Sequence, residues 1–357
     1  MEPMENTIRI IRSVERTHKN LGLPVVFAKL IDLADMGLLI VGERGRGKGA
    51  ILDTIKQLRH RDVLEIARLT PAGLAKVAEK LEGKSYTVVN PDLSSLHNPY
   101  LKEAAINTLA HLLFDRRMPQ SWTGMYSFSI QHCVISFIGA VQPRLLRELN
   151  KLNDWESMYK DRFLRLYLFY PFGTPEYRKD SPRVEPILIP QSSVDSVQIP
   201  AEIRTMDGYN RLKDAIKFQT SEGRCGMFAD KLLQASAFLN CRDVVLKDDV
   251  YFLELFVPYL ALEYWLSERE TISEPFKLNA NSYIMLFYLI ENVEATRKQM
   301  MRHFSVSRAT VMRALEPLKE RNIVCGVYGE DVYHLNPEWH KRYIQPIIDF
   351  GRSIGVC

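Results

Sequence analysis

Several features are scarce in this 357-residue sequence, and each scarcity excludes a class of protein. Its five cysteines are odd in number and include no C-x-x-C pair, so we expect neither a disulfide framework nor a zinc site. No apolar run approaches the length of a membrane span, and the first twenty residues mix charged with apolar residues, unlike a secretory signal. We therefore expect a cytoplasmic protein without a membrane partner.

Charge of one sign is also not in excess. The chain has 47 basic and 43 acidic residues, for a formal net charge of +4, so any partner must be inferred from local clusters of charge. Hydrophobic residues make up 46% of the sequence, which is sufficient for two or three globular domains at this length.

A glycine-rich loop is the strongest motif in the chain. Residues 42–49 read GERGRGKG and stand between an apolar run at 38–41 and a helical apolar pattern from Ile51. A strand, a glycine-rich turn and a helix start form a phosphate cradle, because backbone N–H groups and the helix dipole face the anion. The expected nucleotide-binding residues are Gly42, Glu43, Arg44, Gly45, Arg46, Gly47, Lys48, Gly49 and Ala50.

The loop departs from the G-x-x-x-x-G-K-[ST] pattern at its last position. Lys48 can reach the β- and γ-phosphates, but Gly49 replaces the Ser or Thr whose hydroxyl holds magnesium. Nucleoside monophosphate kinases also have G-K-G after the loop, usually with Thr where this chain has Ala50, so a small-molecule kinase is a minor alternative. An ordinary glycine-rich surface turn is the other interpretation.

Strand and helix patterns alternate through the first two hundred residues. The strands expected after the loop lie at 62–69, 86–89, 132–141 and 161–169. This alternation predicts an α/β fold with a P-loop parallel sheet and helices on both faces. Ligands bind at the carboxyl ends of parallel strands, so Asp92, which follows the strand at 86–89, is expected to share a crevice with the loop and to assist Mg²⁺.

The character of the sequence changes after the segment at 173–200, which is rich in Pro, Ser and charge. Helical patterns follow, and residues 281–335 then read as three helices and a hairpin, the pattern of a winged helix-turn-helix. We expect a nucleotide-binding core at 1–200, a helical lid at 201–272, and a winged helix with a C-terminal tail at 273–357.

The expected winged helix is locally basic, with seven bases and two acids between Arg297 and Arg321. Its third helix begins after Ser307 as N-cap, and side chains near that start can reach bases or phosphates in the major groove. The residues expected to bind double-stranded DNA are Arg297, Lys298, Ser307, Arg308, Thr310 and Arg313. A protein-docking module or a solvated basic face is the alternative.

Taken in order, these features resemble those of AAA+ ATPases, in particular origin-recognition initiators and MCM helicases. The matching segments are 42–48 (Walker A), 86–92 (Walker B), 138–143 (sensor 1), 160–163 (the Arg-Phe element) and 224–250 (the lid). The resemblance implies that Gln142 senses the γ-phosphate, that Arg162 acts as a finger toward a neighbouring subunit's nucleotide, and that Arg224 matches sensor 2. It also implies ATP and Mg²⁺ as cofactors and a homo-oligomer.

The second motif is degenerate as well, because Asn90 and Pro91 precede Asp92 and Leu93 follows it, leaving no evident Glu to orient water. We expect a DNA-associated AAA+ ATPase of a replication, plasmid or mobile-element system that couples ATP binding or slow hydrolysis to DNA binding. Hydrolysis would depend on Lys48, Asp92, Gln142, Arg162 and Arg224. The alternative is a nucleotide-regulated winged-helix transcription factor with little or no hydrolysis.

Overall fold

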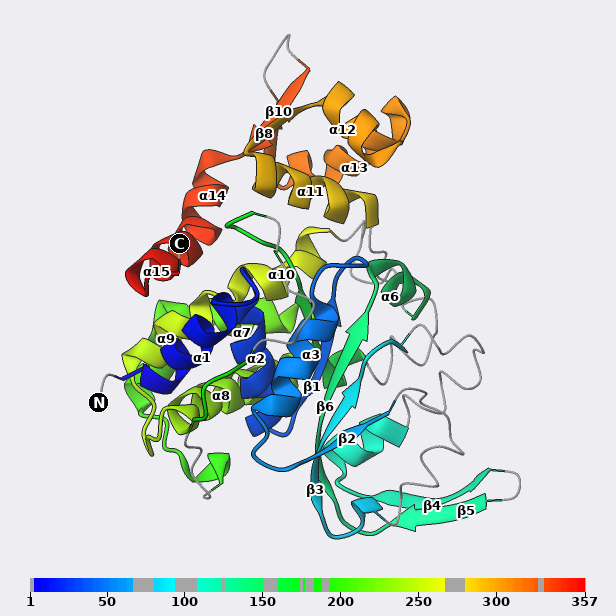
Figure 1. Cartoon of the computed structure of the whole chain (residues 1–357), viewed down its shortest axis with the longest axis vertical. Coiled ribbons are helices and arrows are strands. Elements are labelled where there is room, and N and C mark those ends of the chain that lie inside the picture. Colours follow the sequence, from blue (N-terminus) through cyan, green and yellow to red (C-terminus); the bar gives the residue numbers. More distant parts are fainter. Residues whose placement is uncertain are drawn as a thin grey trace.

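The computed structural model describes residues 3–66, 80–93, 108–123, 126–149, 160–173, 176, 183–187, 193–266, 280–326 and 331–356. A five-stranded sheet of order β2-β3-β6-β1-β7 forms the centre of the molecule, and every neighbouring pair in it is parallel (Figure 1). Its strands are β1 (Gly37–Val41), β2 (Asp62–Glu65), β3 (Ser85–Asn90), β6 (Val134–Val141) and β7 (Phe163–Tyr167). The predicted α/β class with a parallel sheet is confirmed.

Helices flank the sheet, so β1 and β7 are buried along their whole length. β1 and β7 are buried at all five positions, so neither shows the alternation of a half-exposed strand. Helix α2 (Gly22–Leu33) packs on β1 and β6, α3 (Lys48–Gln57) packs on β6, and α10 (Val257–Trp265) packs on β7. α1 (Glu5–Glu15) packs against α2.

The register of the sheet decides which segments meet. Val41, the last residue of β1, lies opposite Val141 in β6 and Tyr167 in β7, so these three strands end level with one another. The loop after β1 and the residues after β6 and β7 therefore share one edge, which we call the carboxyl edge. Gly37 lies opposite Phe137 and Phe163, and the residues before β1 and β7 share the opposite, amino edge.

Residues 201–266 are helical, as expected. They form α7 (Asp207–Lys217), α8 (Glu222–Leu239), α9 (Lys247–Glu254) and α10. The apolar stretch at 250–266 is divided between α9 and α10. Proline is tolerated in the first turn of a helix but disrupts a helix interior, and Pro258 stands at the start of α10.

One supersecondary element was not expected. Residues 108–114 are helical, and β4 (Met118–Thr123) then pairs antiparallel with β5 (Tyr126–Ile130) as a hairpin. Of the strand predicted at 62–69, residues 62–65 form β2, residue 66 lies outside it, and residues 67–69 lie outside the described part of the chain.

A separate three-stranded sheet lies near the C-terminus, with order β8-β10-β9. Its surroundings are α11 (Ala280–Asn292), β8 (Glu294–Thr296), α12 (Arg297–Phe304), α13 (Arg308–Glu320), β9 (Val324–Gly326) and β10 (Val332–Leu335). We call these elements the C-terminal unit; they lie beyond the carboxyl edge of the central sheet (Figure 1). α14 (Pro337–Tyr343) and α15 (Gln345–Ser353) follow. None of the helices described is both long and apolar enough to cross a membrane.

Candidate nucleotide site

The glycine-rich loop lies where the sequence predicted, between β1 and α3. Gly45 and Gly47 have φ angles of 78° and 83°, in the left-handed region that favours glycine, and they turn the chain sharply into the helix. Gly47 is the N-cap of α3, and none of the described side chains caps this helix end. The first backbone N–H groups of α3 therefore remain available for an anion.

Lys48, the first residue of α3, folds back over the loop. Its Nζ donates hydrogen bonds to the carbonyl oxygens of Gly42 at 2.7 Å and Glu43 at 2.8 Å. Burial lowers the pKa of Lys48, while the carboxylates of Glu43 and Asp92 oppose that change. The lysine is thus held at the mouth of the loop by carbonyl groups that a phosphate oxygen can replace.

The residues after β3 and β6 meet this loop at the carboxyl edge. Asp92 is exposed after the end of β3 and contributes to the electrostatic environment of Lys48. Gln142 follows Val141, whose carbonyl oxygen accepts a hydrogen bond from the Gly42 N–H at 3.2 Å. The structure thus brings Lys48, Asp92 and Gln142 to the same edge of the sheet.

Asn90 is a polar residue of this edge that the sequence analysis did not assign to the site. It is fully buried at the last position of β3, and its Nδ2 donates to the carbonyl oxygen of Ile66 at 2.6 Å. Its Oδ1 finds no hydrogen-bond donor among the described residues. The sequence feature that could have identified Asn90 is its amide oxygen, a possible metal ligand, at the end of the apolar run in β3.

The residues at the carboxyl edge suit magnesium only in combination with a nucleotide. Among the described residues, no three His, Cys, Asp or Glu side chains gather into a metal-binding group, and Gly49 supplies no hydroxyl. Magnesium is commonly bound by one or two carboxylates, substrate phosphates and waters. Asp92 and the Asn90 carbonyl are the oxygen groups that fit such a site.

Arg162 and Arg224 lie at the amino edge of the sheet, away from the glycine-rich loop. Arg162 ends a short 3₁₀ turn before β7 and therefore stands at the amino edge, the length of a five-residue strand, roughly 16 Å, from the level of the loop. Arg224 pairs with Asp161 at 3.0 Å, and the guanidinium groups of Arg162 and Arg224 lie 5.3 and 4.6 Å from the centroid of the Phe114 ring. The structure brings these two arginines together, but not to the Lys48 of their own chain.

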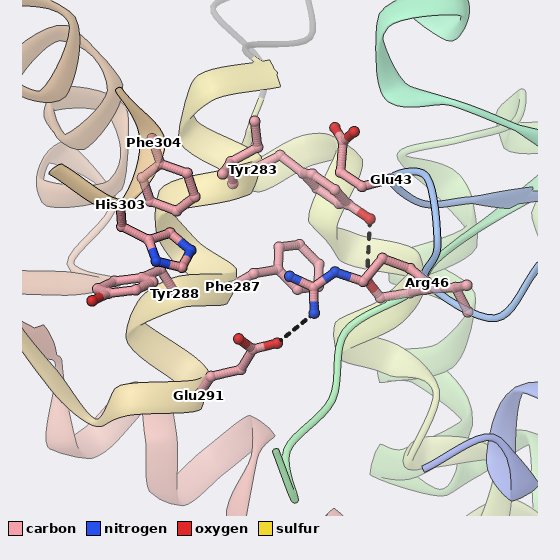
Figure 2. Close-up of a pocket in the computed structure, with 10 residues that line it drawn as sticks. Glu43, Arg46, Tyr283, Phe287, Tyr288, Glu291, His303 and Phe304 are labelled. Atoms are coloured by element: carbon pink, nitrogen blue, oxygen red, sulfur yellow. Dashed lines mark hydrogen bonds and ion pairs between the residues drawn. The ribbon is translucent and has the colours of Figure 1, made fainter. Parts of the chain in front are cut away.

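Helix α11 contributes side chains to the loop that the sequence analysis did not anticipate. Arg46 of the loop forms an ion pair with Glu291 of α11, at 2.8 Å (Figure 2). The hydroxyl of Tyr283, also in α11, lies 3.2 Å from the carbonyl oxygen of Val41 and 3.1 Å from that of Leu168. More than 110 residues of chain separate these partners, so no local sequence pattern could reveal the contact.

The residues predicted to bind DNA divide into two groups. Lys298, Arg308 and Arg313 are exposed on α12 and α13, whereas the guanidinium of Arg297 pairs with Asp331. Ser307 caps α13, as predicted, by accepting a hydrogen bond from the Thr310 N–H at 3.2 Å. Lys298, Arg308 and Arg313 are therefore open to solvent, whereas Arg297 is engaged in an ion pair.

Comparison with known proteins adds no assignment to this geometry, since no protein-family model and no curated protein sequence matches the chain.

Proposed function

We propose that this protein is a DNA-associated ATPase of the AAA+ type that binds ATP with Mg²⁺ at residues 42–50. One observation carries the proposal. A loop with two left-handed glycines joins a central parallel strand to a helix that begins with Lys48, and Asp92 lies within electrostatic reach of that lysine. A strand, a glycine-rich loop and a helix N-terminus in this order are suited to bind a polyphosphate.

Each residue of the edge has a role in this proposal. Lys48 exchanges its two carbonyl partners for phosphate oxygens, and the N–H groups at the start of α3 bind the same anion. Gln142, beside Gly42, orients the terminal phosphate. Asp92 and Asn90 would hold Mg²⁺, which would supply positive charge to neutralise the phosphates.

An assembly of several subunits is part of this proposal, with Arg162 acting on the nucleotide of a neighbouring subunit. Because Arg162 stands at the amino edge, it cannot approach the nucleotide of its own chain without a large rearrangement, whereas a neighbouring subunit could place its loop there. The four helices α7–α10 serve as the lid in this proposal. Arg224, which pairs with Asp161, joins the lid to the segment that carries Arg162.

The C-terminal unit is proposed to be a winged helix-turn-helix that binds duplex DNA. It has three helices, a three-stranded sheet and exposed bases on α12 and α13, and both α11 and α12 pack against α13. The N-terminal half of α13 would enter the major groove, where Arg308 and Arg313 reach phosphates or base edges.

ATP binding to the wild-type chain and to Lys48→Ala tests the nucleotide site, with Lys56→Ala as the matched control. Lys56 lies in the same helix but pairs with Asp53 and Glu65 at the surface. We expect Lys48→Ala to weaken ATP binding by at least about tenfold and Lys56→Ala to leave it unchanged, because only Lys48 faces the loop. An absence of ATP binding by the wild-type chain, or equal affinity in both variants, would overturn the proposal.

A regulator that binds ATP without hydrolysing it is the second candidate. The end of β3 favours it, because Asn90 and Pro91 replace the expected acids and Gly49 offers no hydroxyl. Phosphate release measured with and without duplex DNA separates the two candidates. Tight ATP binding with no phosphate release, together with preference for one duplex sequence, would favour the regulator.

A further inference from the structure

The contact between the phosphate loop and α11 joins two distant parts of the chain at one residue. Arg46 extends from the loop toward the C-terminal unit, and its Nη1 meets Oε1 of Glu291 (Figure 2). The side chains of Arg46 and Glu291 keep only 31% and 14% of their accessible surface, so water screens this ion pair less than a fully exposed pair.

Hydrogen bonds from two tyrosines fix the backbone at Arg46 and at the strand ends beside it. The side chain of Arg46 extends away from this fixed backbone. The hydroxyl of Tyr170 donates a hydrogen bond to the carbonyl oxygen of Arg46, and Tyr283 binds the carbonyl oxygens at the ends of β1 and β7. A change of partner by Arg46 therefore requires only rotation of its side chain. Burial raises the pKa of Tyr283 well above its ordinary value, so the phenol stays protonated and remains a hydrogen-bond donor.

A polyphosphate on the loop would compete directly with Glu291. Arg46 belongs to the loop that the proposed function assigns to ATP, and a guanidinium binds phosphate and carboxylate oxygens with the same planar donor groups. Glu43 lines the same cleft as Arg46, Tyr283 and Glu291, so a second carboxylate also faces this space.

We propose, on the basis of the proposed nucleotide site, that Arg46 exchanges Glu291 for the polyphosphate of ATP and thereby couples the C-terminal unit to nucleotide binding. Glu291 is a positioning residue in this mechanism: it holds Arg46 away from the ligand and attached to α11 when no nucleotide is bound. Binding of ATP breaks the ion pair and releases one of the links between α11 and the loop. By linkage, the Arg46–Glu291 ion pair weakens ATP binding by the same factor by which bound ATP weakens the ion pair.

A double-mutant cycle on Arg46 and Glu291 tests the exchange, with the dissociation constant of MgATP as the measurement. Glu291→Gln keeps the shape of the side chain but removes the competing charge, so ATP should bind about three- to tenfold more tightly. Arg46→Ala should weaken ATP binding by about tenfold, because it removes a charge-assisted bond to phosphate. In the Arg46→Ala background, Glu291→Gln should have no further effect.

The direction of the change in ATP affinity distinguishes competition by Glu291 from a purely structural role. Tighter binding by Glu291→Gln indicates competition, because damage to the fold does not tighten ligand binding. Tyr283→Phe is the matched control, because it removes contacts of α11 with the strand ends but leaves the ion pair intact. Equal ATP affinity in the wild type and Glu291→Gln, or the same tightening with and without Arg46, would overturn the exchange while leaving the nucleotide site in place. If the wild-type chain binds no ATP, the proposed function and this inference both fail.

Discussion

Gly49 stands in the first turn of α3, where a side chain would face open space. A Cβ atom added there has no neighbour within 4 Å, and the φ angle lies outside the left-handed region, so any L-residue fits. The missing hydroxyl is therefore not excluded by packing. The hydroxyl of Ser or Thr at this position is the group that holds magnesium in loops of the G-x-x-x-x-G-K-[ST] type.

We predict that Gly49→Ser increases the dependence of ATP binding on Mg²⁺. The new hydroxyl adds an oxygen ligand at the loop, so the ratio of ATP affinities with Mg²⁺ and with a chelator should rise by about tenfold. Isothermal titration of ATP in both conditions gives this ratio. Gly49→Ala is the matched control, because it adds the same Cβ and the same gain in helix propensity without the oxygen. Equal ratios for the Ser and Ala variants would contradict the prediction.

At the scale of elements, one buried charge network joins α2 to the sheet. The carboxylate of Asp32, with no exposed surface, accepts hydrogen bonds from Lys29 in the same helix, Thr87 in β3 and Ser136 in β6. Arg61, before β2, also pairs with Asp32. These positive neighbours hold the pKa of Asp32 well below its ordinary value, even though burial alone would raise it.

We predict that Asp32→Asn destabilises the fold by about 3–5 kcal/mol, because it leaves the buried ammonium of Lys29 without a compensating charge. Urea unfolding followed by circular dichroism measures the loss. Asp35→Asn is the matched control: Asp35 also pairs with Arg61 but keeps 25% of its side-chain surface, so its removal should cost much less. Similar losses for the two variants would show that burial of the charge does not govern this network.

Some helices and strands could be predicted from the sequence and others could not. β1, the loop and α3 follow from local chemistry, since an apolar run, glycines and a helical pattern succeed one another. The cap of α13 by Ser307 is equally local. The hairpin β4–β5 was missed although Tyr126, Phe128 and Ile130 alternate with polar residues, which is the pattern of a strand.

Some residues of the candidate site could also be predicted from the sequence, whereas others depend on tertiary packing. Asp92 and Gln142 could be placed beside Lys48 because both follow strands, and parallel strands present their ends at one edge. Tyr283 and Glu291 could not be assigned to the site from the sequence, because their contacts depend on how the C-terminal unit packs on the sheet. The role of Arg224 as sensor 2 was implied by the resemblance to AAA+ ATPases and stays a prediction; in this chain Arg224 pairs with Asp161 at the amino edge.

At the scale of the whole molecule, the C-terminal elements are fastened to the rest of the chain at several places. Besides the contacts of α11 with the loop, Trp265 of α10 packs against Trp339 and Tyr343 of α14, with ring centroids 5.2 and 4.8 Å apart. Arg12 of α1 donates a hydrogen bond to the carbonyl oxygen of Ile354 at 2.8 Å. α12 and α13 lie on the side of α11 away from α14 and α15 (Figure 1), and Arg308 and Arg313 of α13 are exposed.

We predict that replacing both Arg308 and Arg313 by Ala weakens duplex DNA binding through loss of phosphate contacts. Each contact that disappears should reduce the dependence of log affinity on log salt by about one unit, so the double variant should lose about two. Fluorescence anisotropy with a labelled duplex over a series of salt concentrations measures both the affinity and this slope. Arg352→Ala is the matched control, since Arg352 is an exposed base on α15, outside the C-terminal unit. An unchanged slope in the double variant would show that α13 is not the DNA-binding helix. A parallel loss in the control would show that binding responds only to net charge.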